Sequence, residues 1–109
     1  MSTTTLTPDV LELIAERFKA LGEPARLQIL NTLRKGDMTV SDLVDETGLG
    51  QANMSRHLRI LHSLGFVKRK KDGLFVYYGI ADRSVFTLCD VMCGKLGAEA
   101  RTRARILSS

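Results

Sequence analysis

Two short helical patterns with a glycine-containing joint between them restrict the fold of this chain more than any other feature. In the first, Thr39 and Asp42 have the spacing of a capping box, and Gly48 ends the apolar pattern. In the second, over 51–64, the apolar residues at helical spacing are Met54, Leu58, Leu61 and Leu64. Gly65 then suits a left-handed C-cap. Two helices joined by about four residues, with glycine in the joint, indicate a helix-turn-helix.

A β-hairpin is predicted directly after these helices. The segments 66–71 and 74–80 flank Asp72 and Gly73, a dipeptide that can take positive φ at both central positions of a type I′ turn. An unbroken run of cations leads into that turn: Lys68, Arg69, Lys70 and Lys71. Because successive strand residues point to opposite faces, both faces of this hairpin would carry positive charge. The pattern predicts an exposed basic wing.

Two further helices are predicted before the helix-turn-helix. Thr7 suits an N-cap and Pro8 suits a first helical turn, so a helix begins there and extends to Gly22. Pro24 begins a second helix, which ends before Gly36. Apolar residues recur at helical spacing in both segments.

A last helix is predicted from about residue 82 to residue 94 or 97. Apolar residues nearly encircle it, which is typical of a buried helix: Val85, Phe86, Leu88, Cys89, Val91, Met92, Cys93 and Leu96. The segment 98–109 is expected to be a basic tail, frayed or mobile, because of Arg101, Arg103 and Arg105. The sequence therefore predicts one domain over 9–97, after a flexible lead over 1–8, with a mainly α fold that carries a β-hairpin wing (α+β).

Length and composition narrow the classes of protein that fit. A chain of 109 residues forms one small domain, and apolar helix faces that its core leaves uncovered would need a second subunit. The formal net charge of +4 suits a polyanionic partner. No apolar run approaches the roughly 18 residues of a membrane span, so no membrane partner is expected. Two cysteines without a secretory leader favour free thiols and a cytoplasmic location. No nucleophile elbow, glycine-rich phosphate loop or HExxH motif occurs, so the protein is not expected to be an enzyme.

The segment 21–30, LGEPARLQIL, resembles the second-helix signature of the ArsR (arsenical repressor, ArsR/SmtB) family of winged helix-turn-helix regulators. The segment 54–58, MSRHL, is similar to that family's recognition helix, and Val76-Tyr77-Tyr78 is similar to part of its wing. The likeness covers roughly residues 10–80, and the last helix matches by position. It implies a winged helix-turn-helix and a homodimer formed by the first and last helices. It also implies a transcriptional repressor that releases a palindromic operator in double-stranded DNA when an effector binds.

Candidate base-reading residues lie on the second helix of the helix-turn-helix. At about 100° per residue, Ala52, Arg56 and Arg59 lie opposite the inward-facing Met54. A helix in the major groove reads bases from its N-terminal half, which makes the candidates Gln51, Ala52, Asn53, Ser55 and Arg56. The alternative is an ordinary polar helix face. His57 lies about 60° from the inward direction, so we expect a packed, hydrogen-bonded histidine, and His62 lies on the helix flank.

Phosphate contacts are expected from Arg59 and from the wing cations Lys68, Arg69, Lys70 and Lys71. Protection of the hairpin edge against aggregation is an alternative role for these cations. A winged helix that binds only a protein partner is a further alternative, against which the basic wing argues.

The resemblance does not determine which effector this protein binds, and the candidate effector site is a pair of cysteines. The segment 41–46 lacks the thiolates that some ArsR members use, and the last helix lacks the histidine of the zinc site of others. Cys89 and Cys93 are four residues apart and share a helix face. Three interpretations remain: a site for trivalent arsenic or antimony, a thiol redox or sulfide switch, and two core residues of a regulator without an effector. A direct disulfide is awkward, because helical Cβ atoms at this spacing lie about 6 Å apart and a disulfide needs about 3.8 Å. No cofactor is required.

Overall fold

The structure follows the element order that the sequence predicts. The computed structural model describes residues 6–108. The helices are α1 (Pro8–Leu21), α2 (Pro24–Leu33), α3 (Val40–Thr47), α4 (Gln51–Ser63) and α5 (Ser84–Ser108). The strands β1 (Val67–Asp72) and β2 (Phe75–Ile80) form an antiparallel hairpin. We call this hairpin, including its turn, the wing. The prediction of a mainly α fold with a β-hairpin wing is confirmed.

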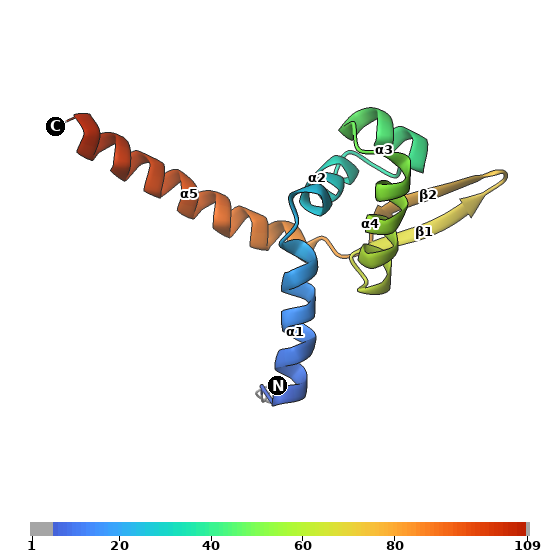
Figure 1. The fold of residues 1–109 in the computed structure, drawn as a ribbon, viewed down its shortest axis with the longest axis horizontal. Helices are drawn as coiled ribbons and strands as arrows, with labels where there is room; N and C mark the ends of the chain where they lie inside the picture. Colours follow the sequence, from blue (N-terminus) through green and yellow to red (C-terminus); the bar gives the residue numbers. More distant parts are fainter. Residues whose placement is uncertain (1–5, 109) are drawn as a thin grey trace.

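Two helices project from a body that contains the rest of the fold. In Figure 1, α2, α3, α4 and the wing lie together, and α1 and α5 extend away from them in different directions. The radius of gyration is 17.3 Å, whereas a compact chain of this length would have about 13 Å. The projecting helices account for this difference.

The hydrophobic core lies where α2, α3 and α4 meet the start of the wing and the start of α5. Its central side chains are inaccessible to solvent: Ile29, Leu43, Met54, Leu58 and Leu61. The predicted inward stripe of α4 is therefore buried, except that its last member, Leu64, is half-buried. This packing fixes which face of α4 points outward.

Side-chain caps begin two of the helices as the sequence predicts. The hydroxyl of Thr7 accepts a hydrogen bond from the amide of Val10 at 3.3 Å. The hydroxyl of Thr39 accepts one from the amide of Asp42 at 3.1 Å, and the Asp42 carboxylate accepts one from the Thr39 amide at 3.2 Å. These bonds satisfy backbone donors that helix starts leave unpaired. At the other end of α3, Gly48 has a φ of 75°, which favours glycine.

The turn of the wing differs from the predicted one. Asp72 pairs with Phe75, so the two-residue loop consists of Gly73 and Leu74. Gly73 has a φ of 63°, and no residue other than glycine has a positive φ within 6–108. A positive φ at the first central position alone is the pattern of a type II′ turn, so the predicted type I′ turn centred on Asp72 and Gly73 is wrong. Asp72 instead ends β1 as a paired strand residue.

The base of the wing is attached to the connection between α2 and α3. Met38 and Tyr78 exchange two backbone hydrogen bonds of 2.9 Å and 2.8 Å. Gly79 is buried next to this bridge, and a Cβ atom there would collide with the Asp37 side chain. The wing is thus fixed at its base, while its turn projects into solvent.

The last helix continues beyond its predicted end. Gly94 and Gly97 both lie inside α5, which reaches Ser108, so the predicted end at either glycine is wrong. Each glycine costs a helix about 1 kcal/mol relative to alanine, but the segment that follows is rich in Ala and Arg, which are strong helix formers. The helix therefore crosses the predicted boundary between the domain over 9–97 and the tail over 98–109. That division and the mobility of the tail stay predictions, and residues 1–5 of the predicted lead lie outside the described part.

Most of α5 is not covered by the rest of the chain. Its buried residues are Val85 and Phe86, both in the first turn. The other large apolar side chains that were expected to be buried are exposed: Leu88, Val91, Met92 and Leu96. The expectation of a buried helix is therefore not met within one chain, because α5 leaves the body after its first turn (Figure 1). Among residues 6–108, no helix is both long enough and apolar enough to span a bilayer.

Candidate nucleic-acid interface

The candidate base-reading residues of α4 are all exposed. Packing of Met54, His57, Leu58 and Leu61 into the core turns the opposite side of α4 outward. That side carries Ala52, Arg56 and Arg59, and the exposed Asn53 and Ser55 flank it, while Gln51 is exposed at the first position of the helix. The N-cap residue of α4 is Gly50, which provides no side-chain cap. The first amide groups of α4 are therefore available to water or to a phosphate.

The four predicted wing cations are also exposed. In the hairpin register, Lys68 and Lys70 point to one face of β1, and Arg69 and Lys71 point to the other. The ion pairs among residues 6–108 are Arg34 with Asp90 and Lys35 with Glu46, so none of the wing cations forms an ion pair with a carboxylate in this part of the chain. The cations of β1 are consequently available to an external polyanion.

The structure places the two sets of candidate residues on neighbouring elements. The backbone turns from α4 into β1 through a hydrogen bond of 2.9 Å from the Phe66 amide to the Leu61 carbonyl.

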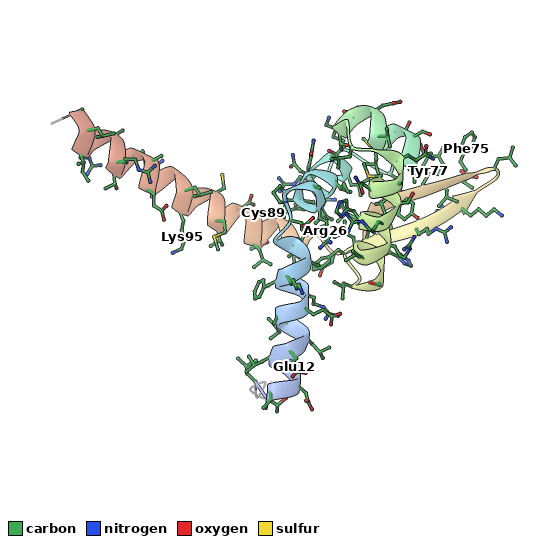
Figure 2. The ribbon with its side chains drawn as sticks, viewed as in Figure 1. Glu12, Arg26, Phe75, Tyr77, Cys89 and Lys95 are labelled. Carbon is green, nitrogen blue, oxygen red and sulfur yellow. The ribbon has the colours of Figure 1, made fainter. Side chains whose placement is uncertain are left out.

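The side chains at the turn of the wing are apolar, unlike the cations beside them. Leu74 is 97% exposed, and Phe75, which Figure 2 labels near the turn, is also exposed. The wing therefore combines one cationic strand, β1, with an apolar end.

His57 is the buried polar side chain behind this surface. It is packed and hydrogen-bonded, as the sequence predicts: its Nδ1 accepts a bond of 3.1 Å from Nε of Arg26. Burial lowers the pKa of His57, the positive charges of Arg26 and Arg56 lower it further, and Glu23 opposes them. The neutral imidazole is therefore favoured. His62 is exposed on the flank of α4.

Sequence reasoning assigned no role to Arg26. The only sequence signal for its contact is that a lone guanidinium lies beside the apolar residues of α2, while a histidine interrupts the apolar face of α4. Neither pattern shows that the two side chains meet.

The two cysteines lie near the start of α5, away from the α4 surface. Both are free thiols, Cys89 half-buried and Cys93 exposed, and Figure 2 shows Cys89 close to the body. Within 6–108, no three His, Cys, Asp or Glu side chains are grouped as a metal site would need. These thiols thus offer an ion two ligands from one chain, and any third would come from outside it.

Comparisons with known proteins agree with this geometry. Residues 23–69 match the family model described as bacterial regulatory protein, arsR family. An uncharacterized HTH-type transcriptional regulator of Methanocaldococcus jannaschii, MJ1325, is 44% identical over 75 residues, which are 68% of this chain and 84% of that protein. The transcriptional repressor SmtB homolog of Synechocystis is 36% identical over 86 residues, which cover 74% of this chain and 65% of that protein.

Two solved structures share the fold over most of the chain. The crystal structure of Mycobacterium tuberculosis Rv0081 superposes with a TM-score of 0.79 at 32% identity, covering 90% of this chain and 99% of that one. The homodimeric winged helix-turn-helix DNA-binding domain of Mb0332 from Mycobacterium bovis, solved by NMR, has a TM-score of 0.73 at 30% identity. It covers 87% of this chain and 92% of that one.

Proposed function

Because this chain belongs to the ArsR family of winged helix-turn-helix transcriptional regulators, we propose that it represses transcription as a homodimer on a palindromic operator. The coarser role follows from the family: the protein is a DNA-binding transcriptional regulator and not an enzyme. The proposal adds the residues that contact DNA, the subunit arrangement and the effector. DNA as the partner and two free thiols are consistent with a cytoplasmic location.

The observation that carries the proposal is the combination of an exposed α4 face with wing cations that form no ion pair within 6–108. In our proposal the α4 residues Gln51, Ala52, Asn53, Ser55 and Arg56 read base edges in the major groove. Arg59 and the wing cations Lys68, Arg69, Lys70 and Lys71 hold phosphates.

The exposed apolar faces of α1 and α5 support a homodimer. Phe18 on α1 is 58% exposed and Met92 on α5 is 62% exposed, and Leu88 and Val91 on α5 are exposed as well. Exposed large apolar side chains grouped on a helix face are typical of an interaction site. Val10 and Ile14, on the same helix as Phe18, are half-buried. The related Mb0332 domain is homodimeric. A two-fold axis would place two α4 helices about one turn of DNA apart, roughly 34 Å, which suits a palindrome.

A mobility-shift assay with DNA from upstream of the protein's own gene tests this proposal. We expect binding to one upstream duplex and weaker binding to a shuffled duplex of equal length and composition. Equal affinity for both duplexes would contradict sequence-specific recognition. A complete absence of binding at low salt would favour the alternative of a module that contacts only a protein partner.

For the effector, we propose that trivalent arsenic or antimony binds at Cys89 and Cys93. Soft thiolates favour thiophilic ions, and the two thiols share one face of α5 and are not part of the buried core. A third ligand would come from the partner subunit or from solvent. Because α5 carries the proposed dimer surface, drawing these thiols together would shift the subunits and change the separation of the two α4 helices.

The effector proposal is tested by titrating arsenite, antimonite and polysulfide separately against the protein–DNA complex. We expect arsenite or antimonite to release DNA from the wild type, and Cys89→Ser and Cys93→Ser to bind DNA but not release it. Met92→Leu is the matched control, since it removes an exposed sulfur of α5 without removing a thiol. Release by polysulfide alone, through these cysteines, would replace this effector with a redox or sulfide signal. Release from both serine variants as from wild type would place the sensor elsewhere.

A further inference from the structure

Arg26 connects three helices through its guanidinium. From its position on α2, Nη1 donates a hydrogen bond of 3.1 Å to the carbonyl oxygen of Ala20, near the end of α1. Nε donates another, also of 3.1 Å, to Nδ1 of His57 on α4. Figure 2 labels Arg26 where these helices meet.

Both acceptors of Arg26 are shielded from water. Ala20 and His57 are each only 4% exposed, and Ala20 is the buried residue of α1. Breaking either bond would leave a buried acceptor without its partner, which costs more than losing an exposed hydrogen bond. Of the side-chain hydrogen bonds described for 6–108, those of Arg26 are the ones that join α1 to α2 and α2 to α4.

The chemistry of the bond to His57 fixes the state of the imidazole. A guanidinium carries only donors and remains charged at any physiological pH. Nδ1 of His57 must therefore be unprotonated, with its proton on Nε2. Protonating Nδ1 would remove the acceptor and place an imidazolium beside a guanidinium. The charged groups that act on His57 are Arg26 and Glu23 from the α2 segment and Arg56 from α4 itself.

We infer that Arg26 is a positioning residue for DNA recognition, which holds α4 at a fixed orientation relative to α1 through neutral His57. The inference rests on the proposed function, in which α1 belongs to the dimer surface and α4 reads the operator. In a two-fold dimer, the relation of α1 to α4 within each subunit sets the spacing of the two reading helices. A small error in that spacing reduces operator affinity and leaves phosphate attraction nearly unchanged.

The quantity that tests this inference is the specificity ratio, the affinity for the upstream duplex divided by that for the shuffled duplex. Phosphate attraction acts on both duplexes, so pH and salt effects on it largely cancel in the ratio. Arg26→Lys keeps the charge but loses the fork that reaches two acceptors. We expect it to lower the ratio about tenfold near neutral pH. The matched control is Arg17→Lys, because the Arg17 guanidinium bonds only to Leu13 of its own helix.

The pH dependence of the specificity ratio is a second test, because this dependence would be absent if Arg26 only stabilised the fold. Between about pH 8 and about pH 5, we expect the wild-type ratio to fall as His57 gains a proton. The profile of His57→Gln should be flat, because an amide keeps a neutral acceptor and does not titrate. His62→Gln, which changes an exposed histidine on the same helix, should retain the wild-type profile.

These outcomes separate this inference from the proposed function. Failure of the wild type to prefer any upstream duplex overturns the proposed function itself. If the wild type prefers the upstream duplex, and Arg26→Lys and Arg17→Lys both keep the wild-type specificity ratio, the positioning role is overturned. A wild-type profile that matches that of His57→Gln would overturn it independently, and decides the question if Arg26→Lys does not fold.

Discussion

The guanidinium of Arg34, at the C-terminal end of α2, lies 4.0 Å from the centroid of the Phe86 ring, in the first turn of α5. Nη2 of the same guanidinium lies 3.9 Å from a carboxylate oxygen of Asp90, one turn further along α5. Since the buried residues of α5 are Val85 and Phe86, these contacts lie at the junction where the long helix joins the body.

Loss of the cation–π contact at this junction should weaken the folded state. We expect Arg34→Gln to lower the free energy of unfolding by about 0.5–1 kcal/mol, the usual value for such a contact at a partly exposed site. Urea denaturation followed by circular dichroism measures the change. Arg83→Gln is the comparison, because that guanidinium lies further from the same ring, at 5.6 Å, and should contribute less. An equal loss in both variants would argue against a specific contribution of Arg34.

Arg56→Ala should relax sequence preference. A bidentate arginine contact to a guanine contributes about 1–3 kcal/mol of discrimination. We therefore expect affinity for the upstream duplex to fall by that amount, and affinity for the shuffled duplex to change much less. Binding titrations with both duplexes at one salt concentration provide the comparison. An unchanged specificity ratio would mean that the reading face of α4 is misplaced.

Lys70→Ala should weaken binding to both duplexes alike. Loss of one phosphate contact releases fewer counterions, so the slope of log K against log salt should become shallower by roughly 0.9. Titrations at several salt concentrations measure this slope. Lys19→Ala, which removes an exposed cation of α1, serves as the control and should leave the slope unchanged. A selective loss on the upstream duplex would instead make Lys70 a base-reading residue.

A charge placed on the apolar face of α5 should separate the subunits. Met92 is 62% exposed in the single chain, and Met92→Lys would bury an unpaired ammonium if that face lies in a dimer. We expect sedimentation velocity to show dimers for the wild type and mostly monomers for this variant at micromolar concentration. Asp45→Lys, with the same new side chain on the exposed surface of α3, should remain dimeric. A variant that dimerises as the wild type does would place the interface elsewhere.

The stability of the fold should decrease in mild acid because of His57. Burial first, and the Arg26 charge second, hold the pKa of His57 below its ordinary value of 6.5. Between these two pKa values the unfolded chain binds more protons than the folded one, so the free energy of unfolding falls as pH is lowered below about 6.5. Urea denaturation at a series of pH values measures this dependence. In His57→Gln the contribution of His57 to the pH dependence of the free energy of unfolding should disappear. If the variant shows the same pH dependence as the wild type, other groups cause it.

Local signals in the sequence predicted much of the fold because they act over a few residues. The Thr39 capping box, the glycine after α3 and the buried stripe of α4 are all found in the structure. The turn of the wing was mispredicted because Asp72-Gly73 and Gly73-Leu74 are both acceptable loops, and the strand register chooses between them. The end of α5 was mispredicted because a helix tolerates glycine when strong helix formers follow.

The candidate interface was easier to locate than the contacts behind it. Exposure of Arg56 and of the wing cations follows from the opposite, apolar face of α4 and from the run of like charges. The partner of His57 could not be predicted, since Arg26 lies on another helix and only tertiary packing brings the two together.

The bridge between Met38 and Tyr78 is the point at which the wing is held to the body, so a change there changes the direction of the whole wing. The turn lies about four residues from Tyr78, or roughly 13 Å at the usual rise of a strand. A rotation of about 10° at the bridge would thus carry Leu74 through roughly 2 Å. Met38 belongs to the connection between α2 and α3, and this connection contains none of the candidate DNA-contacting residues. Substitutions there would nevertheless re-aim the cations of β1 and alter the path of the DNA backbone over the protein.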